Sequence, residues 1–174
     1  MTLVDEAARA GAKADGRTAD AATERAIIRL IHRAARLADD QDFLGWMNLF
    51  ADDGEYSAIT NENLKYKGLR LFRDVGRAAL HQRVAFLLGL WQVPRAKSTH
   101  LVANIEVSAG EGPDEASAVS NYLIARTGEL EHTKLHAAGR YQDRFVRQDG
   151  AWRFKERLVI VDSNLLPAEF TELL

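Results

Sequence analysis

The sequence contains no cysteine. A chain without cysteine forms no disulfide bond, no thiolate zinc site, no catalytic thiol and no iron–sulfur cluster held by its own thiolates. It also lacks any apolar run near the roughly 18 residues of a membrane-spanning helix, and its N-terminus has no apolar signal-peptide core. We therefore expect a soluble cytoplasmic protein with no membrane partner.

An excess of charge of one sign is absent too. The 23 Lys and Arg residues nearly balance 25 Asp and Glu, which gives a formal charge of −2. A nucleic-acid-binding domain is expected to be clearly basic, so this balance argues against such a partner. The length of 174 residues suits one domain with a real core. We predict a flexible extension over residues 1–19, rich in alanine, glycine and charge, and a single domain over residues 20–174.

Helical patterns fill the first half of the chain, and strand patterns fill the second half. Apolar residues at helical spacing predict helices after the capping residues Asp20 and Asp42, and a third helix over about 74–90. Alternating patterns and turn residues predict strands at 55–60, 100–108, 116–127, 131–147 and 151–164. Helices on one side of an antiparallel sheet form an α+β fold. A long curved sheet wrapped around helices would form a cone with a cavity.

The last two strands predict a β-hairpin closed on Asp149-Gly150, the strongest short-range signal in the chain. With a two-residue loop, Phe145 faces Phe154, and Asp143 faces Glu156. Side chains alternate between the two faces of a strand, so these two carboxylates share a face with aromatic residues. The opposite face is basic and carries Arg140, Arg144, Arg153, Lys155 and Arg157.

The two carboxylates allow two interpretations. Enclosed in a cone, one of them could stay protonated and act as a general acid or base, as in an isomerase or dehydratase. Tyr56, His100 and Asn121 are the candidate helpers in that cavity. Alternatively a nearby Arg, Lys or His neutralises Asp143 and Glu156, and the pairs are structural.

The basic face suggests a subunit interface. The aromatic residues of the hairpin lie on the face opposite the cations, which argues against the stacking of single-stranded nucleic acid bases on the basic face. The run 158–161 is apolar on both faces, as is 101–103, which is typical of strands covered on both sides. Since helices cover only the inner face of a cone, we expect a neighbouring subunit on the outer face. The predicted interface residues are Leu101, Arg153, Arg157, Val159 and Val161.

The five histidines do not predict a metal site. His132 and His136 are four residues apart, which would suit one face of a helix. They lie in a region with strand character, where their Cα atoms would be roughly 13 Å apart. That separation is too long for one ion, so we expect no metal ligand in this chain.

Five segments of the chain, taken in order, carry a resemblance to a known family. They are Trp46–Tyr56, His81–Val84, Ser98–Val107, Ser120–Arg126 and Gly139–Asp162. Together they resemble the small (beta) subunit of aromatic-ring-hydroxylating dioxygenases. The fold implied is the cone of nuclear transport factor 2, ketosteroid isomerase and scytalone dehydratase, also called cystatin-like. The chain departs from this family at residues 59–63, where many members have a proline-containing segment, and in its N-terminal extension.

The resemblance implies a non-catalytic structural subunit of the terminal oxygenase component in aromatic catabolism. In this family the small subunits form a homotrimer that supports three large alpha subunits. The Rieske [2Fe-2S] cluster and the mononuclear iron belong to the large subunit, which performs the cis-dihydroxylation with electrons from NADH. Two alternatives remain open: a self-sufficient dehydratase or isomerase that uses Asp143 and Glu156, and a scaffold unrelated to oxygenases.

Overall fold

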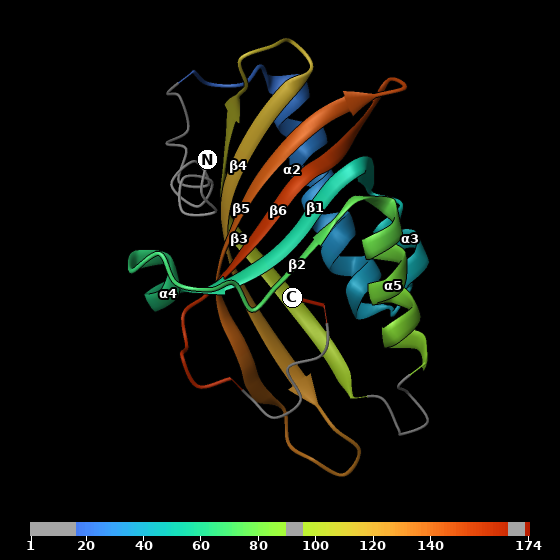
Figure 1. Ribbon diagram of the computed structural model, residues 1–174, viewed down its shortest axis with the longest axis vertical. Helices are drawn as coiled ribbons and strands as arrows, with labels where there is room; N and C mark the ends of the chain where they lie inside the picture. Colours follow the sequence, from blue (N-terminus) through green and yellow to red (C-terminus); the bar gives the residue numbers. More distant parts are fainter. Residues whose placement is uncertain (1–16, 90–95, 167–172) are drawn as a thin grey trace.

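The computed structural model describes residues 17–89, 96–166 and 173–174 (Figure 1). Within the described residues, two helices come first, strands and helices then alternate, and four consecutive strands follow. The helices are α2 (Ala21–Asp39), α3 (Phe43–Met47), α4 (Asn61–Lys65) and α5 (Gly76–Gly89). The strands are β1 (Phe50–Thr60), β2 (Phe72–Val75), β3 (Lys97–Ala109), β4 (Glu115–Thr127), β5 (Lys134–Gln148) and β6 (Ala151–Val161).

The strands form one six-stranded sheet in the order β2-β1-β6-β5-β4-β3. Figure 1 shows a long, twisted sheet with α2 behind it, α3 and α5 beside the same face, and α4 on the other side. This arrangement confirms the predicted α+β fold. The sheet is mixed rather than wholly antiparallel, because β1 runs parallel to β6. We call the face that packs against α2 the inner face, and the opposite face the outer face.

Helix α2 forms as its sequence predicts. The Asp20 carboxylate caps it by accepting hydrogen bonds from the backbone N–H groups of Ala22 and Thr23, at 2.9 and 3.1 Å. Its apolar stripe is buried against the inner face of the sheet. The buried residues are Ile27, Leu30, Ile31, Ala34 and Ala38.

Aromatic side chains dominate the space between the helices and the inner face. Each fully buried side chain of this size contributes roughly 1.5–3 kcal/mol by leaving water. The Trp46 ring contacts the rings of Phe50 and Tyr56 at centroid distances of 4.7 and 4.8 Å. A well-packed interior follows, filled by Trp46, Phe50, Tyr56, Tyr122, Tyr141, Phe145 and Phe154.

The hairpin between β5 and β6 turns at Asp149-Gly150, as predicted, with both residues at positive φ. Phe145 pairs with Phe154, but the register shifts between Arg144 and Phe145, and Arg144 then pairs with Glu156. Lys155 is therefore the extra residue of a β-bulge. A one-residue shift moves every later side chain to the other face of the sheet. The prediction that Asp143 faces Glu156 is wrong, because the bulge places Arg157 there.

Other differences lie near β1. Strand β1 begins at Phe50 rather than at the predicted residue 55, and its pairing with β6 shifts between Phe50 and Glu55. Helix α4 and strand β2 were not predicted. Thr60 caps α4 by accepting a hydrogen bond from the Asn63 N–H at 3.1 Å, a signal that was present in the sequence.

The chain boundaries are described only in part. Residues 1–16 lie outside the described residues, so the predicted flexible extension stays a prediction, as does the single domain over 20–174. The segment just before α2 is ordered against the edge strand β3, where the Ala109 N–H donates to the Arg17 carbonyl at 2.9 Å. Trp91 and Pro94, expected at the end of the third helix, also lie outside the described residues.

Candidate functional site

The carboxylate that the sequence places inside the cone is neutralised by an arginine. Asp143 and Arg157 form a bidentate ion pair, with Nε to Oδ1 at 2.9 Å and Nη2 to Oδ2 at 2.8 Å. Their side chains are 1% and 3% exposed. Burial raises the pKa of the Asp143 carboxyl, and Arg157 opposes this shift. The structural interpretation of Asp143 therefore fits this geometry better than an acid–base role.

The same guanidinium lies between two aromatic rings. Arg157 Cζ lies 4.4 Å from the Tyr141 ring centroid and 4.2 Å from that of Phe154. Cation–π contacts of this kind are strongest where water is excluded. The predictions that placed Arg157, Val159 and Val161 on the outer face are therefore wrong, because the bulge turns all three into the core.

His100 forms a second buried polar group on the inner face, and its partner was not predicted. Asp39, at the end of α2, lies 2.6 Å from His100 Nδ1. It also accepts a hydrogen bond from the backbone N–H of His100 at 3.0 Å. The His100 side chain is 2% exposed, and its Nε2 has no hydrogen-bond partner among the described residues. With Nδ1–H held by a carboxylate, Nε2 is the nitrogen that carries a lone pair.

The tyrosines of the inner face differ in their partners. Tyr56 Oη accepts a hydrogen bond from the Leu174 N–H at 3.0 Å, so the hydroxyl of this predicted helper already has a partner within the protein. Tyr122 stacks on Tyr141 at 4.5 Å, and its hydroxyl has no partner within the part of the chain described. Burial raises the pKa of Tyr122. Of the three predicted helpers, Tyr56 and His100 lie on the inner face, whereas Asn121 is exposed on the outer face.

The outer face near residues 158–161 is covered by the chain itself. Ile59, Leu158 and Ile160 form a small buried cluster against Leu64 of α4. The prediction that 158–161 is covered on both faces is confirmed, but the bulge turns Leu158 and Ile160 outward in place of Val159 and Val161. No neighbouring subunit is needed to cover this cluster.

A second apolar patch on the outer face stays uncovered by the described residues. Leu101 of β3 pairs directly with Leu123 of β4, and the two side chains are 60% and 46% exposed. Leu135, which is also exposed, pairs with Ala125 in the next strand. Leu101 thus keeps its predicted position. Arg153 also keeps an outward position and donates to the Asn48 carbonyl.

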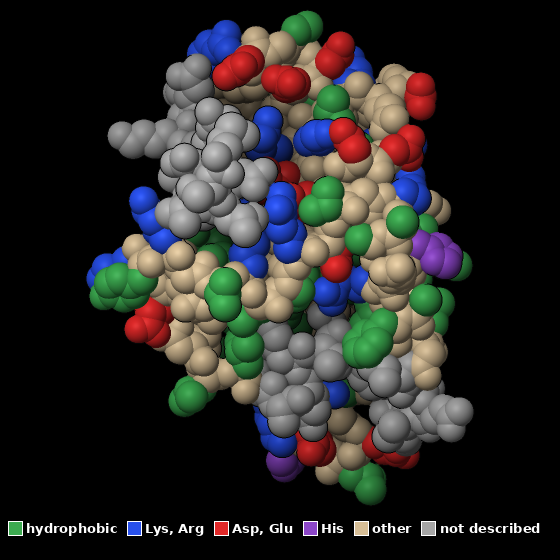
Figure 2. Space-filling model, viewed as in Figure 1, with side chains coloured by type: hydrophobic (Ala, Val, Ile, Leu, Met, Phe, Trp, Pro, Cys, Tyr) green, Lys and Arg blue, Asp and Glu red, His purple; other side chains and the backbone are tan. Residues whose placement is uncertain are grey.

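Charged side chains occupy the other half of the outer face. Figure 2 shows Lys and Arg side chains gathered over the middle of this face, with Asp and Glu side chains between them. Glu55 and Glu156 are direct neighbours on the parallel strands β1 and β6. Burial acts to raise the pKa of Glu55, but Arg73 and Arg70 outweigh it and lower that pKa. Burial and the Glu55 charge raise the pKa of Glu156.

Among the described residues, no group of three His, Cys, Asp or Glu side chains is arranged to hold a metal ion. His132 lies in the exposed loop before β5, and His136 lies within that strand. A Rieske centre needs two cysteines and two histidines, so a chain with no cysteine does not fit one. In the same residues, no helix is long and apolar enough to span a bilayer.

Comparison with known proteins identifies a domain family that matches this sequence and solved structures that share its fold. The model of the SnoaL-like domain matches residues 19–158. The beta subunit assigned to an aromatic-ring-hydroxylating dioxygenase of Novosphingobium aromaticivorans is 27% identical, with 87% of this chain and 95% of that chain covered and a TM-score of 0.77.

Two further structures share the fold at lower identity. The beta subunit of benzoate 1,2-dioxygenase from Burkholderia mallei is 18% identical, with 90% and 99% of the chains covered and a TM-score of 0.71. A protein assigned as a scytalone dehydratase, from Novosphingobium aromaticivorans, is 24% identical, with 83% and 92% covered and a TM-score of 0.62. The fold is thus shared by oxygenase subunits and by dehydratases.

Proposed function

Because the chain belongs to the SnoaL-like domain family, we propose that it is a non-catalytic beta subunit of an aromatic-ring-hydroxylating dioxygenase. The observation that supports this most is the state of Asp143. An acid–base residue must exchange protons with a substrate, whereas this carboxylate is 1% exposed and held in a bidentate ion pair with Arg157, whose guanidinium contacts aromatic rings. The 27% identity to a dioxygenase beta subunit points the same way.

In this role the protein acts through assembly. The exposed pair Leu101 and Leu123 supplies an apolar contact surface on the outer face, suited to a second copy in a homotrimer or to the large subunit. The Rieske cluster and the mononuclear iron belong to the large subunit, which oxidises the aromatic substrate. This chain would fix the shape of the complex from which that activity comes.

A dehydratase or isomerase is the second candidate, and a different observation favours it. The Asp39–His100 pair holds one ring nitrogen and leaves His100 Nε2 buried without a partner in the described residues. That nitrogen has the arrangement of a general base oriented by a carboxylate. In this function His100, rather than Asp143 or Glu156, would move the proton.

Purification alone and co-expression separate the two functions. The first predicts a colourless protein without turnover, which co-purifies with a large subunit when each large subunit encoded in the source genome is co-expressed. Turnover of a hydroxylated aromatic compound by the isolated protein, lost in His100→Gln, would instead establish the dehydratase or isomerase.

A further inference from the structure

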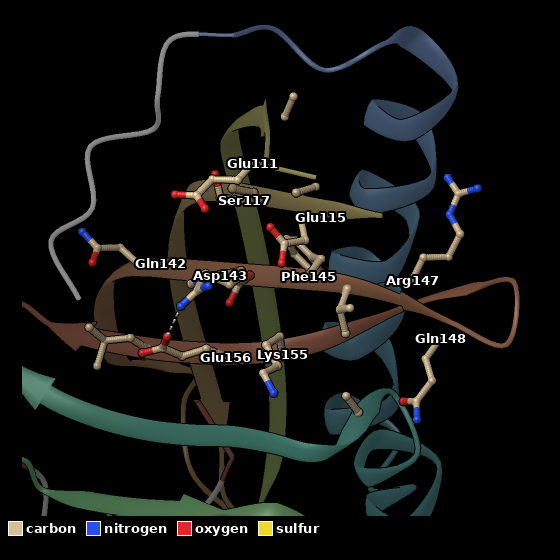
Figure 3. Close-up of a pocket in the computed structure, with 18 of the residues that line it drawn as sticks. Glu111, Glu115, Ser117, Gln142, Asp143, Phe145, Arg147, Gln148, Lys155 and Glu156 are labelled. Atoms are coloured by element: carbon tan, nitrogen blue, oxygen red, sulfur yellow. Dashed lines mark ion pairs between the residues drawn. The ribbon is translucent and has the colours of Figure 1, made fainter. Parts of the chain in front are cut away.

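A groove crosses the outer face above β4, β5 and β6. Its volume is about 1000 Å³. Figure 3 shows Glu111, Glu115, Gln142 and Glu156 around it. Leu158 and Val119 contribute apolar surface to its lining. The groove is thus large enough for a side chain and part of the backbone of another molecule.

Glu156, which lines this groove, and its neighbour Glu55 on β1 are unequally paired. Glu55 is held by Arg70 and by Arg73, the latter at 2.9 Å. Glu156 has Arg144 Nη1 at 3.8 Å, beyond hydrogen-bond distance, and the Arg144 side chain is 62% exposed. The Glu156 side chain itself is 21% exposed. A largely desolvated carboxylate whose ion pair is this loose retains capacity for a strong donor.

A second acceptor lies on the same face. Gln142 Oε1 is buried and accepts no hydrogen bond from any described residue. Gln142 pairs with Leu158, and Arg144 pairs with Glu156, so Gln142 and Glu156 are diagonal neighbours on adjacent strands. An unpaired buried acceptor is costly. Gln142 Oε1, next to the loosely paired Glu156 carboxylate, therefore indicates room for one further donor.

The other charges of the groove do not supply this donor. Lys155 forms an ion pair with Asp53, and Arg147 lies 3.5 Å from Asp114. Glu111 and Glu115 add further negative charge to the lining. The donor that fits is therefore cationic and carries several N–H groups, which describes a guanidinium better than an ammonium.

We propose that this groove binds an arginine side chain of a partner protein, whose guanidinium bridges the Glu156 carboxylate and the Gln142 amide oxygen. The fork of five N–H donors can reach two acceptors at once, while the apolar lining covers the aliphatic part of the side chain. The identity of the partner, a large oxygenase subunit, rests on the proposed function. The chemistry of the groove does not, so it is testable on the isolated chain.

The test titrates the full chain with Nα-acetyl-arginine amide and records the side-chain NMR signals of Glu156 and Gln142. Its neutral isostere, Nα-acetyl-citrulline amide, is the matched probe. We expect the arginine probe to shift both signals and to bind at least about tenfold more tightly than the citrulline probe, because a charge-assisted hydrogen bond is lost. Glu156→Gln should weaken arginine binding by about the same factor, whereas the control Glu111→Gln should change it less than about twofold.

The pH dependence has a definite sign. Because protonated Glu156 cannot pair with a guanidinium, binding should weaken as the pH falls through the raised pKa of Glu156. Equal binding of the two probes, or unchanged binding in Glu156→Gln, would overturn the proposal. A tenfold gain in affinity in the double variant Arg9→Gln/Lys13→Gln would also overturn it, since the occupant would then be the chain's own N-terminal segment. Loss of co-purification with unchanged probe binding would instead contradict the proposed function alone.

Discussion

The two faces of the sheet differ in how completely their buried carboxylates are paired with cations. On the inner face, Asp143 is buried and is matched by one bidentate arginine, whose guanidinium contacts two aromatic rings. On the outer face, Glu156 lies in an open groove, and its ion pair with Arg144 is loose, at 3.8 Å. A closed, fully paired group stabilises a fold, whereas a loosely paired group at a groove keeps capacity for a partner. From this difference we propose a structural role for the interior of the cone and a recognition role for its outer face.

The largest expected effect comes from breaking the inner pair. Arg157→Met leaves Asp143 buried without its partner and should lower the free energy of unfolding by about 3–5 kcal/mol. Urea denaturation followed by circular dichroism measures this change. The double variant Asp143→Leu/Arg157→Met removes both charges and should recover much of the loss. A double variant as unstable as the single one would show that packing, and not charge pairing, governs this site.

A smaller effect is expected at His100. His100→Gln removes the ring that contacts Asp39 but keeps the backbone N–H donor of residue 100. The free energy of unfolding should fall by about 1–3 kcal/mol, measured by the same denaturation. Thr99→Ser, an exposed neighbour on the outer face, is the control and should behave as the wild type. An unchanged stability of His100→Gln would mean that the buried pair is kept for chemistry, which favours the dehydratase.

The smallest effect sharpens the contrast on the outer face. The pKa of Glu156 is raised in the folded protein, so its ionised form is the destabilised one. Stability from this group is present at acidic pH and is lost as the pH rises through the raised pKa. Glu156→Gln should therefore raise the free energy of unfolding by up to about 1 kcal/mol at pH 7, with no gain near pH 4. Thermal unfolding at the two pH values checks this, and an equal gain at both would refute the assigned charge effect.

Local patterns were sufficient to predict much of this architecture. Asp20 and the apolar stripe after it predicted α2, and Asp149-Gly150 predicted the hairpin, because caps and tight turns depend on neighbouring residues. The bulge at Lys155 was missed, since nothing within β6 alone requires it. Beyond the bulge, Glu55 of β1 pairs with Glu156, a contact between distant segments that sequence alternation cannot reveal.

Contacts between distant segments also explain which site residues were missed or misplaced. Asp39 was not among the predicted site residues, because its partner His100 lies 61 residues away in the sequence. The bulge shifts the register by one residue, so Arg157 lies on the inner face and Glu156 on the outer face, the reverse of the prediction. As a result, Glu156 no longer faces Asp143, and Arg157, Val159 and Val161 are no longer available to the predicted interface. The two-sided apolar character of 158–161 and the outward position of Leu101 were independent of the register and were correctly predicted.

The central claim is that this protein works through its outer face while its interior is structural. Sedimentation velocity of wild type and of Leu101→Asp/Leu123→Asp, alone and with the co-expressed large subunit, tests it most directly. We predict that the double variant keeps the wild-type unfolding midpoint, because both side chains are exposed, and loses assembly. Unchanged assembly of the folded double variant across the range of protein concentrations would contradict the account.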